Sequence, residues 1–183
     1  SYSGVRPLYE DHAASNSTVT RDYVFELDNE GGAPILSVYG GKITTYRKLA
    51  EHALEKLGRV LALPGKAWTA NAPLPGGDMP DGDFAAFLWR ISERYEWLPP
   101  EMLLRLARAY GTRIEAVIGP AGSLGELGAH MGGNLYEAEL RYLFDAEYAR
   151  TAQDVLWRRS KLGLHLPVGA QQAVADWFAA QTS

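Results

Sequence analysis

The chain has 183 residues, of which 46% are hydrophobic and 22% charged, and its formal net charge is −4 at pH 7. This composition is sufficient for a buried core, and the acidic balance argues against nucleic acid as a partner. The absence of cysteine excludes disulfides, thiolate chemistry and cysteine-ligated zinc. No metal site is predicted, because the histidines never lie at ligand spacing: His12, His52, His130 and His165. No apolar window approaches the roughly 18 residues needed to span a membrane.

The first residues predict that the chain is part of a longer protein. Ser1 to Val5 do not resemble a leader peptide, and the first methionine is Met79. We therefore expect a preceding segment that supplies part of the first structural layer.

The first predicted elements are two strands that form a β-hairpin. Residues 20–27 alternate between apolar and polar side chains, the turn-rich segment 28–34 follows, and residues 35–39 form a second apolar run. The inward face of the first strand carries Tyr23, Phe25 and Leu27. Arg21 shares this face, and its charge needs a partner there, which is either a surface ion pair or a bound anion.

A glycine pair then meets the start of a predicted helix. Gly40 and Gly41 let the backbone approach a ligand, and the residues that follow present free N–H groups. Thr44 and Thr45 can cap the helix, which is expected to end at Gly58. A helix start at the end of a buried strand is where open α/β sheets bind ligands, so this junction is a candidate cofactor cradle.

Three cations in the same part of the chain lie next to a proline, a strand end or a helix start. Arg6 precedes Pro7, Arg21 lies at the strand end, and Lys42 lies at the start of the helix. Two guanidinium groups and one ammonium around a helix N-terminus would bind phosphate well. Scattered surface cations are the alternative interpretation, because arginine and lysine are mostly exposed in any protein.

The best boundary candidate is the segment 64–80, which contains four prolines and three glycines. We predict a mixed α and β region over residues 1–63, a linker over 64–80 and a helical region over 81–183. The chain is therefore expected to belong to the α+β class.

Apolar periodicity predicts the helices of the last region. They are expected over residues 84–97, 99–111, a short piece from 112, 137–147, 151–161 and 170–181. The glycine-rich segment 119–133 is expected to be a loop without an element. The last helix is expected to bury Val174, Trp177 and Phe178.

The polar and aromatic side chains of the helical region are interpreted as structural. The carboxylates are expected to be arginine partners and not catalytic groups: Glu137, Glu139 and Asp154. The aromatics at helical spacing are expected in the core: Tyr136, Tyr142, Tyr148 and Trp157. A basic cluster is either a solvated helix face that caps a helix C-terminus or a contact for anionic lipid: Arg158, Arg159 and Lys161.

Five sequence blocks carry a resemblance along nearly the whole chain: Ser3-Gly-Val-Arg-Pro-Leu8, Thr20-Arg-Asp-Tyr23, Gly40-Gly-Lys-Ile-Thr-Thr-Tyr-Arg-Lys-Leu-Ala-Glu51, Glu137-Ala-Glu-Leu-Arg-Tyr142 and Ala152-Gln-Asp-Val-Leu-Trp-Arg-Arg159. In order and spacing they resemble the C-terminal third of the aerobic, FAD-dependent glycerol-3-phosphate dehydrogenases. In that family a preceding Rossmann-type segment with a G-x-G-x-x-G motif holds the FAD.

The resemblance implies a reaction and a role for each site residue. Glycerol 3-phosphate would be oxidised to dihydroxyacetone phosphate by hydride transfer to FAD, and the electrons would pass to quinone. Arg6 and Arg21 match the positions that hold the substrate phosphate, and Lys42 resembles a lysine of the same pocket. The residues expected to contact FAD are Gly40, Gly41, Lys42, Ile43 and Thr44. The general base, a histidine, would belong to the preceding segment, so no catalytic residue is expected in this chain.

The resemblance also implies an arrangement and partners. Residues 1–63 would be a short β-hairpin and helix from the end of an FAD and substrate domain, and residues 81–183 an all-α cap domain. The expected partners are the preceding FAD-binding segment, glycerol 3-phosphate and a quinone. A homodimer and a peripheral contact with the cytoplasmic face of the inner membrane are further alternatives for a cytoplasmic protein.

Two other functions stay open at this point. The helical region alone could be a non-catalytic interaction module for dimerisation or membrane docking. A related flavin oxidase acting on an amine would not need two arginines for phosphate.

Overall fold

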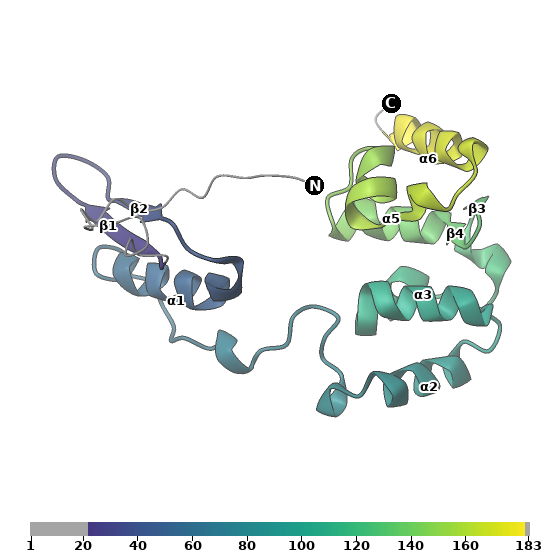
Figure 1. Cartoon of the computed structure of the whole chain (residues 1–183), viewed down its shortest axis with the longest axis horizontal. Coiled ribbons are helices and arrows are strands. Elements are labelled where there is room, and N and C mark those ends of the chain that lie inside the picture. Colours follow the sequence, from purple (N-terminus) through teal and green to yellow (C-terminus); the bar gives the residue numbers. More distant parts are fainter. Residues whose placement is uncertain (1–21, 182–183) are drawn as a thin grey trace, which may run out of the picture. The chain divides into compact units, whose positions relative to one another are not determined.

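A computed structural model describes residues 22–181 of the chain (Figure 1). It divides into two compact units between Ala72 and Pro73, within the segment expected to be the linker. Each unit is described separately below.

The first unit consists of a hairpin and a helix. Strands β1 (Val24–Asp28) and β2 (Ile35–Tyr39) pair antiparallel, with Val24 opposite Tyr39 and Asp28 opposite Ile35. Helix α1 (Tyr46–Leu57) lies against the hairpin and continues a single 3₁₀ turn, Ile43–Thr45 (Figure 1). The predicted hairpin and the predicted helix ending at Gly58 are both confirmed.

The first unit has almost no interior of its own. None of its described residues, 22–72, is fully buried. A two-stranded hairpin and one helix provide only one apolar contact layer, and this is too little for a closed core. Large apolar side chains therefore stay in solvent, including Ile43 at 89% exposure and Trp68 at 74%.

The second unit is mostly helical. Its helices are α2 (Phe84–Arg94), α3 (Pro100–Tyr110), α4 (Ile114–Ile118), α5 (Glu137–Ala146), a π-helix (Asp154–Arg159) and α6 (Val168–Gln181). A small antiparallel hairpin joins β3 (His130–Gly132) to β4 (Leu135–Tyr136) just before α5. With the hairpin of the first unit, this composition confirms the α+β class.

Local sequence explains where these helices begin. Asp83 precedes α2, and its carboxylate accepts a hydrogen bond from the N–H of Ala86 at 3.0 Å. Pro100 occupies the first turn of α3, where its missing N–H costs nothing. At the start of the π-helix, Thr151 and Asp154 exchange side-chain and backbone hydrogen bonds, which is a capping arrangement.

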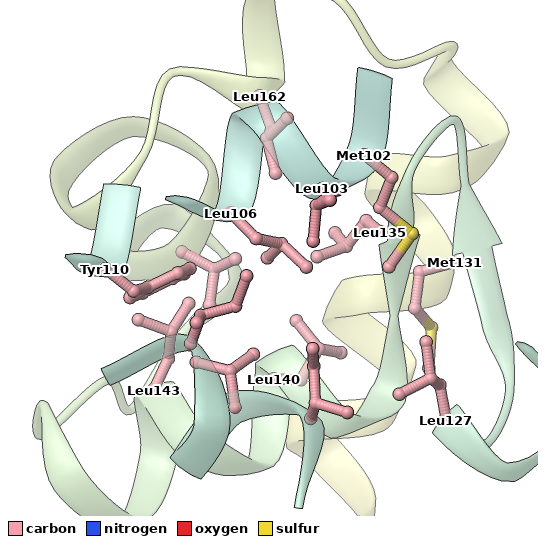
Figure 2. Close-up of a cluster of buried hydrophobic side chains, with 14 of the residues drawn as sticks. Met102, Leu103, Leu106, Tyr110, Leu127, Met131, Leu135, Leu140, Leu143 and Leu162 are labelled. Atoms are coloured by element: carbon pink, nitrogen blue, oxygen red, sulfur yellow. The ribbon is translucent and has the colours of Figure 1, made fainter. Parts of the chain in front are cut away.

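A single apolar core fills the second unit. Figure 2 shows Leu103 and Leu106 of α3 and Leu140 and Leu143 of α5 in one cluster, with Leu135 beside Leu103. The largest fully buried side chains are Leu106, Ile114, Leu135, Leu140, Leu143, Val155 and Val174. Aromatic side chains pack α5 against α6. The ring centroid of Phe144 is 6.1 Å from that of Trp177 and 6.3 Å from that of Phe178.

Four expectations about this unit are wrong, two in this paragraph and two in the next. The segment 119–133 is not free of elements, because it contains the 3₁₀ turn Leu124–Leu127 and the strand β3, both too short to show a period. Trp177 is only half-buried, although Val174 and Phe178 are buried as expected.

Two aromatics expected in the core are exposed. Tyr148 is 74% exposed, because α5 ends at Ala146 and the helical spacing does not extend to it. Trp157 is 38% exposed, because it belongs to a π-helix, whose wider turn changes which residues share a face. Tyr136 and Tyr142 are partly buried and pack against the core.

Candidate functional site

The candidate site is the glycine turn between β2 and α1. Gly40 and Gly41 have φ angles of 70° and 101°, a region that disfavours other residues. A Cβ atom on Gly41 would lie 3.2 Å from Cδ1 of Leu49 and 3.6 Å from Cβ of Tyr23. The backbone angle therefore favours glycine at position 41, and a side chain there would also press on the end of Leu49.

The turn leaves two backbone amides available to a ligand. The N–H of Lys42 is directed at Oγ1 of Thr45 at 3.4 Å, and the hydroxyl and N–H of Thr45 both donate to the carbonyl of Lys42 at 3.0 Å. The N–H groups of Ile43 and Thr44 have no hydrogen-bond acceptor among residues 22–181. The positive end of α1 is thus presented to solvent through these two amides.

Two exposed side chains flank these amides. Lys42 is exposed, and within the described part of the chain its ammonium forms no ion pair or hydrogen bond. Ile43 is the most exposed large apolar side chain among residues 22–181. A cation, free amides and an apolar side chain at one helix start suit a ligand with an anionic edge and a flat apolar body.

A separate polar cluster links α1 to the segment that follows it. Glu51 accepts hydrogen bonds from Arg47 at 3.1 Å, from the N–H of Thr69 at 3.2 Å and from the hydroxyl of Thr69. These contacts, with the Thr69 hydroxyl as the largest, hold the pKa of Glu51 below its usual value. The segment that follows residue 63 is therefore attached to α1 at Thr69 and is not free along its whole length.

The two arginines expected at the phosphate lie outside the described residues. Arg6 and Arg21 both fall within residues 1–21, so the structure gives their side chains no position. Of the expected site residues, Gly40, Gly41, Lys42, Ile43 and Thr44 are described, and they lie together in one turn.

The carboxylates of the helical unit have the structural role expected of them. Glu137 pairs with Arg141 at 2.6 Å and Asp154 pairs with Arg158 at 3.0 Å. Glu139 is buried and accepts two hydrogen bonds from Arg105, at 2.8 and 2.7 Å.

Glu139 lies in a network of hydrogen bonds. Arg105 also donates to the carbonyl of Asn134 at 2.7 Å, and the hydroxyl of Tyr110 donates to Glu139 at 2.7 Å. Burial lowers the pKa of Arg105, but its bonds to Glu139 outweigh this effect, so its pKa lies above the ordinary value. Burial, together with the Glu139 charge, also raises the pKa of Tyr110.

The basic cluster of the helical unit forms hydrogen bonds to other residues of the same unit. Arg158 and Arg159 both reach Asp154, and Arg159 donates to the carbonyl of Glu147, just beyond the end of α5, at 2.9 Å. Lys161 donates to the carbonyl of Trp157. These bonds favour the interpretation as a cap for a helix C-terminus over a lipid contact.

Two contacts near the site could not be found from sequence patterns. The hydroxyl of Tyr23 bonds to His52, and the carboxylate of Glu51 bonds to Thr69, across 29 and 18 positions respectively. The alternation of the first strand placed Tyr23 on the inward face, but nothing in the pattern identifies its partner on α1.

Two classes of site are not found in the described part of the chain. Residues 22–181 contain no group of three or more metal-binding side chains. None of the helices described there is long and apolar enough to cross a bilayer.

Comparison with curated proteins gives relatives that match almost the whole chain. Aerobic glycerol-3-phosphate dehydrogenase of Escherichia coli (strain K12) is 47% identical over 99% of the chain, and D-erythritol 1-phosphate dehydrogenase of Brucella abortus (strain 2308) is 46% identical over 97%. Glycerol-3-phosphate dehydrogenase of Pseudomonas aeruginosa is also 46% identical over 97%. The chain spans about a third of the length of these relatives, at 35% to 36% of each.

A family match covers the helical unit and the segment before it. Residues 67–182 match the family described as the C-terminal domain of alpha-glycerophosphate oxidase. The relatives agree with this match, and so does the resemblance carried by the five sequence blocks. The chain therefore belongs to the family of the C-terminal domain of alpha-glycerophosphate oxidase and corresponds to the C-terminal part of the aerobic glycerol-3-phosphate dehydrogenases.

Proposed function

We propose that this chain is the C-terminal part of an FAD-dependent dehydrogenase that oxidises sn-glycerol 3-phosphate to dihydroxyacetone phosphate and passes the electrons to quinone. The observation that carries the proposal is the start of α1, where a glycine turn presents two unbonded amides beside an unpaired lysine. The names of the Escherichia coli and Pseudomonas aeruginosa relatives support the substrate.

The residues at this helix start fit FAD. FAD held there would supply the hydride acceptor for C2 of the substrate. The amides of Ile43 and Thr44, at the positive end of a helix of 12 residues, would stabilise the negative charge of the reduced ring with about half a unit of positive charge. Lys42 adds a full charge, and glycine at position 41 keeps the surface free of a side chain.

The substrate phosphate would be held by arginine. Arg6 and Arg21 would each offer two parallel N–H donors to phosphate oxygens, which a lysine cannot do. Binding the phosphate at one end of the substrate orients the carbon that reacts at the other end. The roles of these two arginines in the reaction are therefore binding and orientation.

The preceding FAD-binding segment is the proposed partner of the first unit. One apolar side of helix α1 packs on the hairpin. Ala50 and Leu54 lie one turn apart on another side of the helix, and both are exposed, with an exposed fraction of 58% for Leu54. A helix with apolar side chains beyond its packed face is normally covered from two sides. The relatives are nearly three times as long as this chain, which leaves ample sequence for such a segment.

The Brucella abortus relative favours a second candidate substrate. It is named a D-erythritol 1-phosphate dehydrogenase and matches the chain about as well as the glycerol-3-phosphate enzymes do. Both substrates are phosphorylated polyols that differ in the length of the carbon chain, so the same phosphate and cofactor contacts would serve either.

The proposal is tested in the full-length enzyme. We expect reduction of bound FAD by glycerol 3-phosphate, and Arg21→Ala should raise KM and lower kcat with flavin content unchanged. Loss of flavin in this variant would contradict the phosphate role. Reduction by D-erythritol 1-phosphate alone would transfer the assignment to the second substrate, and reduction by an amine alone would refute both.

A further inference from the structure

The connection between α1 and the second unit is an exposed stretch of chain with short turns only (Figure 1). Every residue from 61 to 68 is exposed, including the apolar side chain of Trp68. Within the described part of the chain, all hydrogen bonds between residues 62–72 and α1 involve Thr69. The attachment of the connection to α1 therefore depends on Thr69 and its partners.

Thr69 forms a triangle of hydrogen bonds with Glu51 and Arg47. The hydroxyl of Thr69 donates to Oε1 of Glu51 and accepts from Arg47 at 3.2 Å, and the N–H of Thr69 donates to the same Oε1 at 3.2 Å. Arg47 also donates to Oε2 of Glu51 at 3.1 Å. Each of these bonds has a charged donor or a charged acceptor, and such bonds are stronger than neutral ones. We call these three residues the latch.

The latch is better shielded from water than an ordinary surface ion pair. The side chains of Glu51 and Arg47 are 20% and 32% exposed, whereas those of Glu115 and Arg94 in the helical unit are both more than half exposed. Exposed pairs contribute little, because water and salt screen them. Partial cover and hydrogen bonds on both oxygens of Glu51 therefore make the latch strong enough to hold an exposed chain.

The second unit holds the other end of the same connection. The N–H of Thr112 donates to the carbonyl of Gly76 at 3.1 Å, so the chain is fixed again at that point. With the latch closed, only residues 70–75 separate the two fixed points. With the latch open, the free stretch extends back to Leu61, whose N–H is bonded to the carbonyl of Leu57 at the end of α1. The span of a flexible chain rises with the square root of its length, so opening lengthens it about 1.5-fold.

We infer that the latch of Arg47, Glu51 and Thr69 sets the length of free chain between the two units and thereby limits their relative motion. Motion is the usual behaviour of units joined by a flexible connection. The family match supports a boundary device, because it begins at residue 67 and so includes Thr69 but not Glu51. The inference goes beyond the proposed function and does not depend on it, since the latch involves no substrate or cofactor contact.

Spin labels on the full-length protein measure this range of motion. Lys48→Cys places one label on α1, and Glu93→Cys places the other on α2. Both native side chains are exposed, and neither has a hydrogen bond or ion pair to any residue that the structure describes. The chain has no cysteine of its own, so only cysteines of the preceding segment need to be replaced. Pulsed electron–electron double resonance then gives the distribution of distances between the two labels.

Four variants are compared in this labelled background. Glu51→Ala removes the carboxylate of the latch, and Thr69→Val removes the hydroxyl but keeps the N–H. Thr69→Ser keeps both groups. Glu55→Ala is the matched control, because Glu55 lies one turn further along α1, is exposed and has no hydrogen bond or ion pair among residues 22–181. Alanine favours the helix, so neither alanine variant weakens α1 through its helix propensity.

Glu51→Ala should widen the distance distribution by about 1.5-fold. Thr69→Val should widen it by less, because the bond from the N–H of Thr69 to Glu51 remains. Thr69→Ser and Glu55→Ala should leave the width unchanged. Hydrogen exchange at the Thr69 amide should be about tenfold faster in Glu51→Ala than in Glu55→Ala, because this amide loses a charged acceptor.

The inference is overturned by any of three results. These are equal widths for Glu51→Ala and Glu55→Ala, a distribution for Thr69→Ser as wide as that for Thr69→Val, or a lower melting temperature of Glu51→Ala with an unchanged width. The last result would reduce the latch to a stabilising contact within the first unit. Because the labels report distance and not turnover, failure to oxidise glycerol 3-phosphate would count against the proposed function alone.

Discussion

Burial decides how much an ion pair contributes at the scale of single residues. Glu139 is buried, and it pairs with Arg105, whose side chain is also mostly covered. Glu115 pairs with Arg94 at 2.6 Å, but both side chains are more than half exposed. The exposed pair is screened by water, whereas removing the charge of the buried acid leaves a buried guanidinium without its counter-ion.

Glu139→Gln should lower the free energy of unfolding by about 3 kcal/mol, because a broken buried pair typically costs about 3 to 5 kcal/mol. Glu115→Gln is the matched control and should change it by less than about 1 kcal/mol. Urea unfolding followed by circular dichroism measures both. Equal effects of the two substitutions would show that burial does not govern these pairs.

Asp154 predicts a pH dependence of stability. Its carboxylate accepts hydrogen bonds from the N–H groups of Arg150 and Thr151, at 3.0 and 2.9 Å, and from the Thr151 hydroxyl. These bonds, with that from Arg150 as the largest contribution, lower the pKa of Asp154 to about 2. The ionised form is thus favoured in the folded state.

The stability that Asp154 adds is therefore complete above its unfolded pKa of about 4 and is lost as the pH falls toward 2. Asp154→Asn should lower the melting temperature at pH 6, and this difference should shrink steadily between pH 4 and pH 2.5. Thermal unfolding of both proteins across this range provides the measurement. A difference that stays constant with pH would mean that the charge of Asp154 is not involved.

At the scale of elements, the segment before α2 is clamped onto the end of α3. The N–H of Thr112 donates to the carbonyl of Gly76 at 3.1 Å, and the hydroxyl of Thr112 bonds to Asp78. Gly76 and Gly111 have φ angles of 87° and 55°, and a Cβ on either would collide with a backbone carbonyl, that of Tyr110 or of Gly76. The two glycines therefore let two backbones touch directly.

Gly76→Ala should lower the free energy of unfolding by more than about 3 kcal/mol, because backbone strain and a steric clash add together. Gly82→Ala is the matched control, since Gly82 also has a positive φ, 66°, but open space around it. It should cost only the strain, about 1 to 2 kcal/mol. Chemical unfolding of the two variants separates the clash from the strain, and similar losses would disprove the clamp.

The same scale shows what a single sequence can predict. Helices α2, α3 and α5 have apolar side chains at regular spacing, and Asp83, Pro100 and Gly111 are clear boundary signals, so the existence of these helices follows from pattern. The end of α2 does not, because the helix expected to reach residue 97 ends at Arg94. Strand β3 is three residues long and gives no usable signal. The helix expected over residues 151–161 is present, but its π-helical period could not be read from the pattern. Pattern also lacks long-range information, which is why the partners of Tyr23 and of Glu139 emerge only from the fold.

The candidate site was predictable for a different reason. The Gly40-Gly41 pair is a local signal, because a positive φ and a close approach depend on adjacent residues. Which amides are unbonded is not a local property of the pattern. It depends on the rotamer of Thr45, whose hydroxyl oxygen accepts a hydrogen bond from the N–H of Lys42, whereas the N–H groups of Ile43 and Thr44 stay unbonded.

At the scale of the whole molecule, the two units differ in whether they can fold alone. The second unit contains all the fully buried residues found among 22–181, whereas the first unit has none. Independent stability requires apolar burial that outweighs chain entropy, and only the second unit has a closed core. The second unit begins at Pro73, so it includes Gly76 and Asp78, whose hydrogen bonds to Thr112 form the clamp. A fragment that begins at residue 80 lacks these bonds.

A fragment of residues 73–183 should therefore unfold in one cooperative transition, and a fragment of residues 80–183 should be less stable by about 2 kcal/mol, the sum of two lost hydrogen bonds. A fragment of residues 1–72 should show no cooperative transition. Urea titrations of the three fragments measure their free energies of unfolding. Gly76→Ala in the 73–183 fragment is an internal control, and this variant should be no more stable than the 80–183 fragment. Equal stability of the two longer fragments would place the whole fold-determining region after residue 80 and would refute a structural role for the clamp.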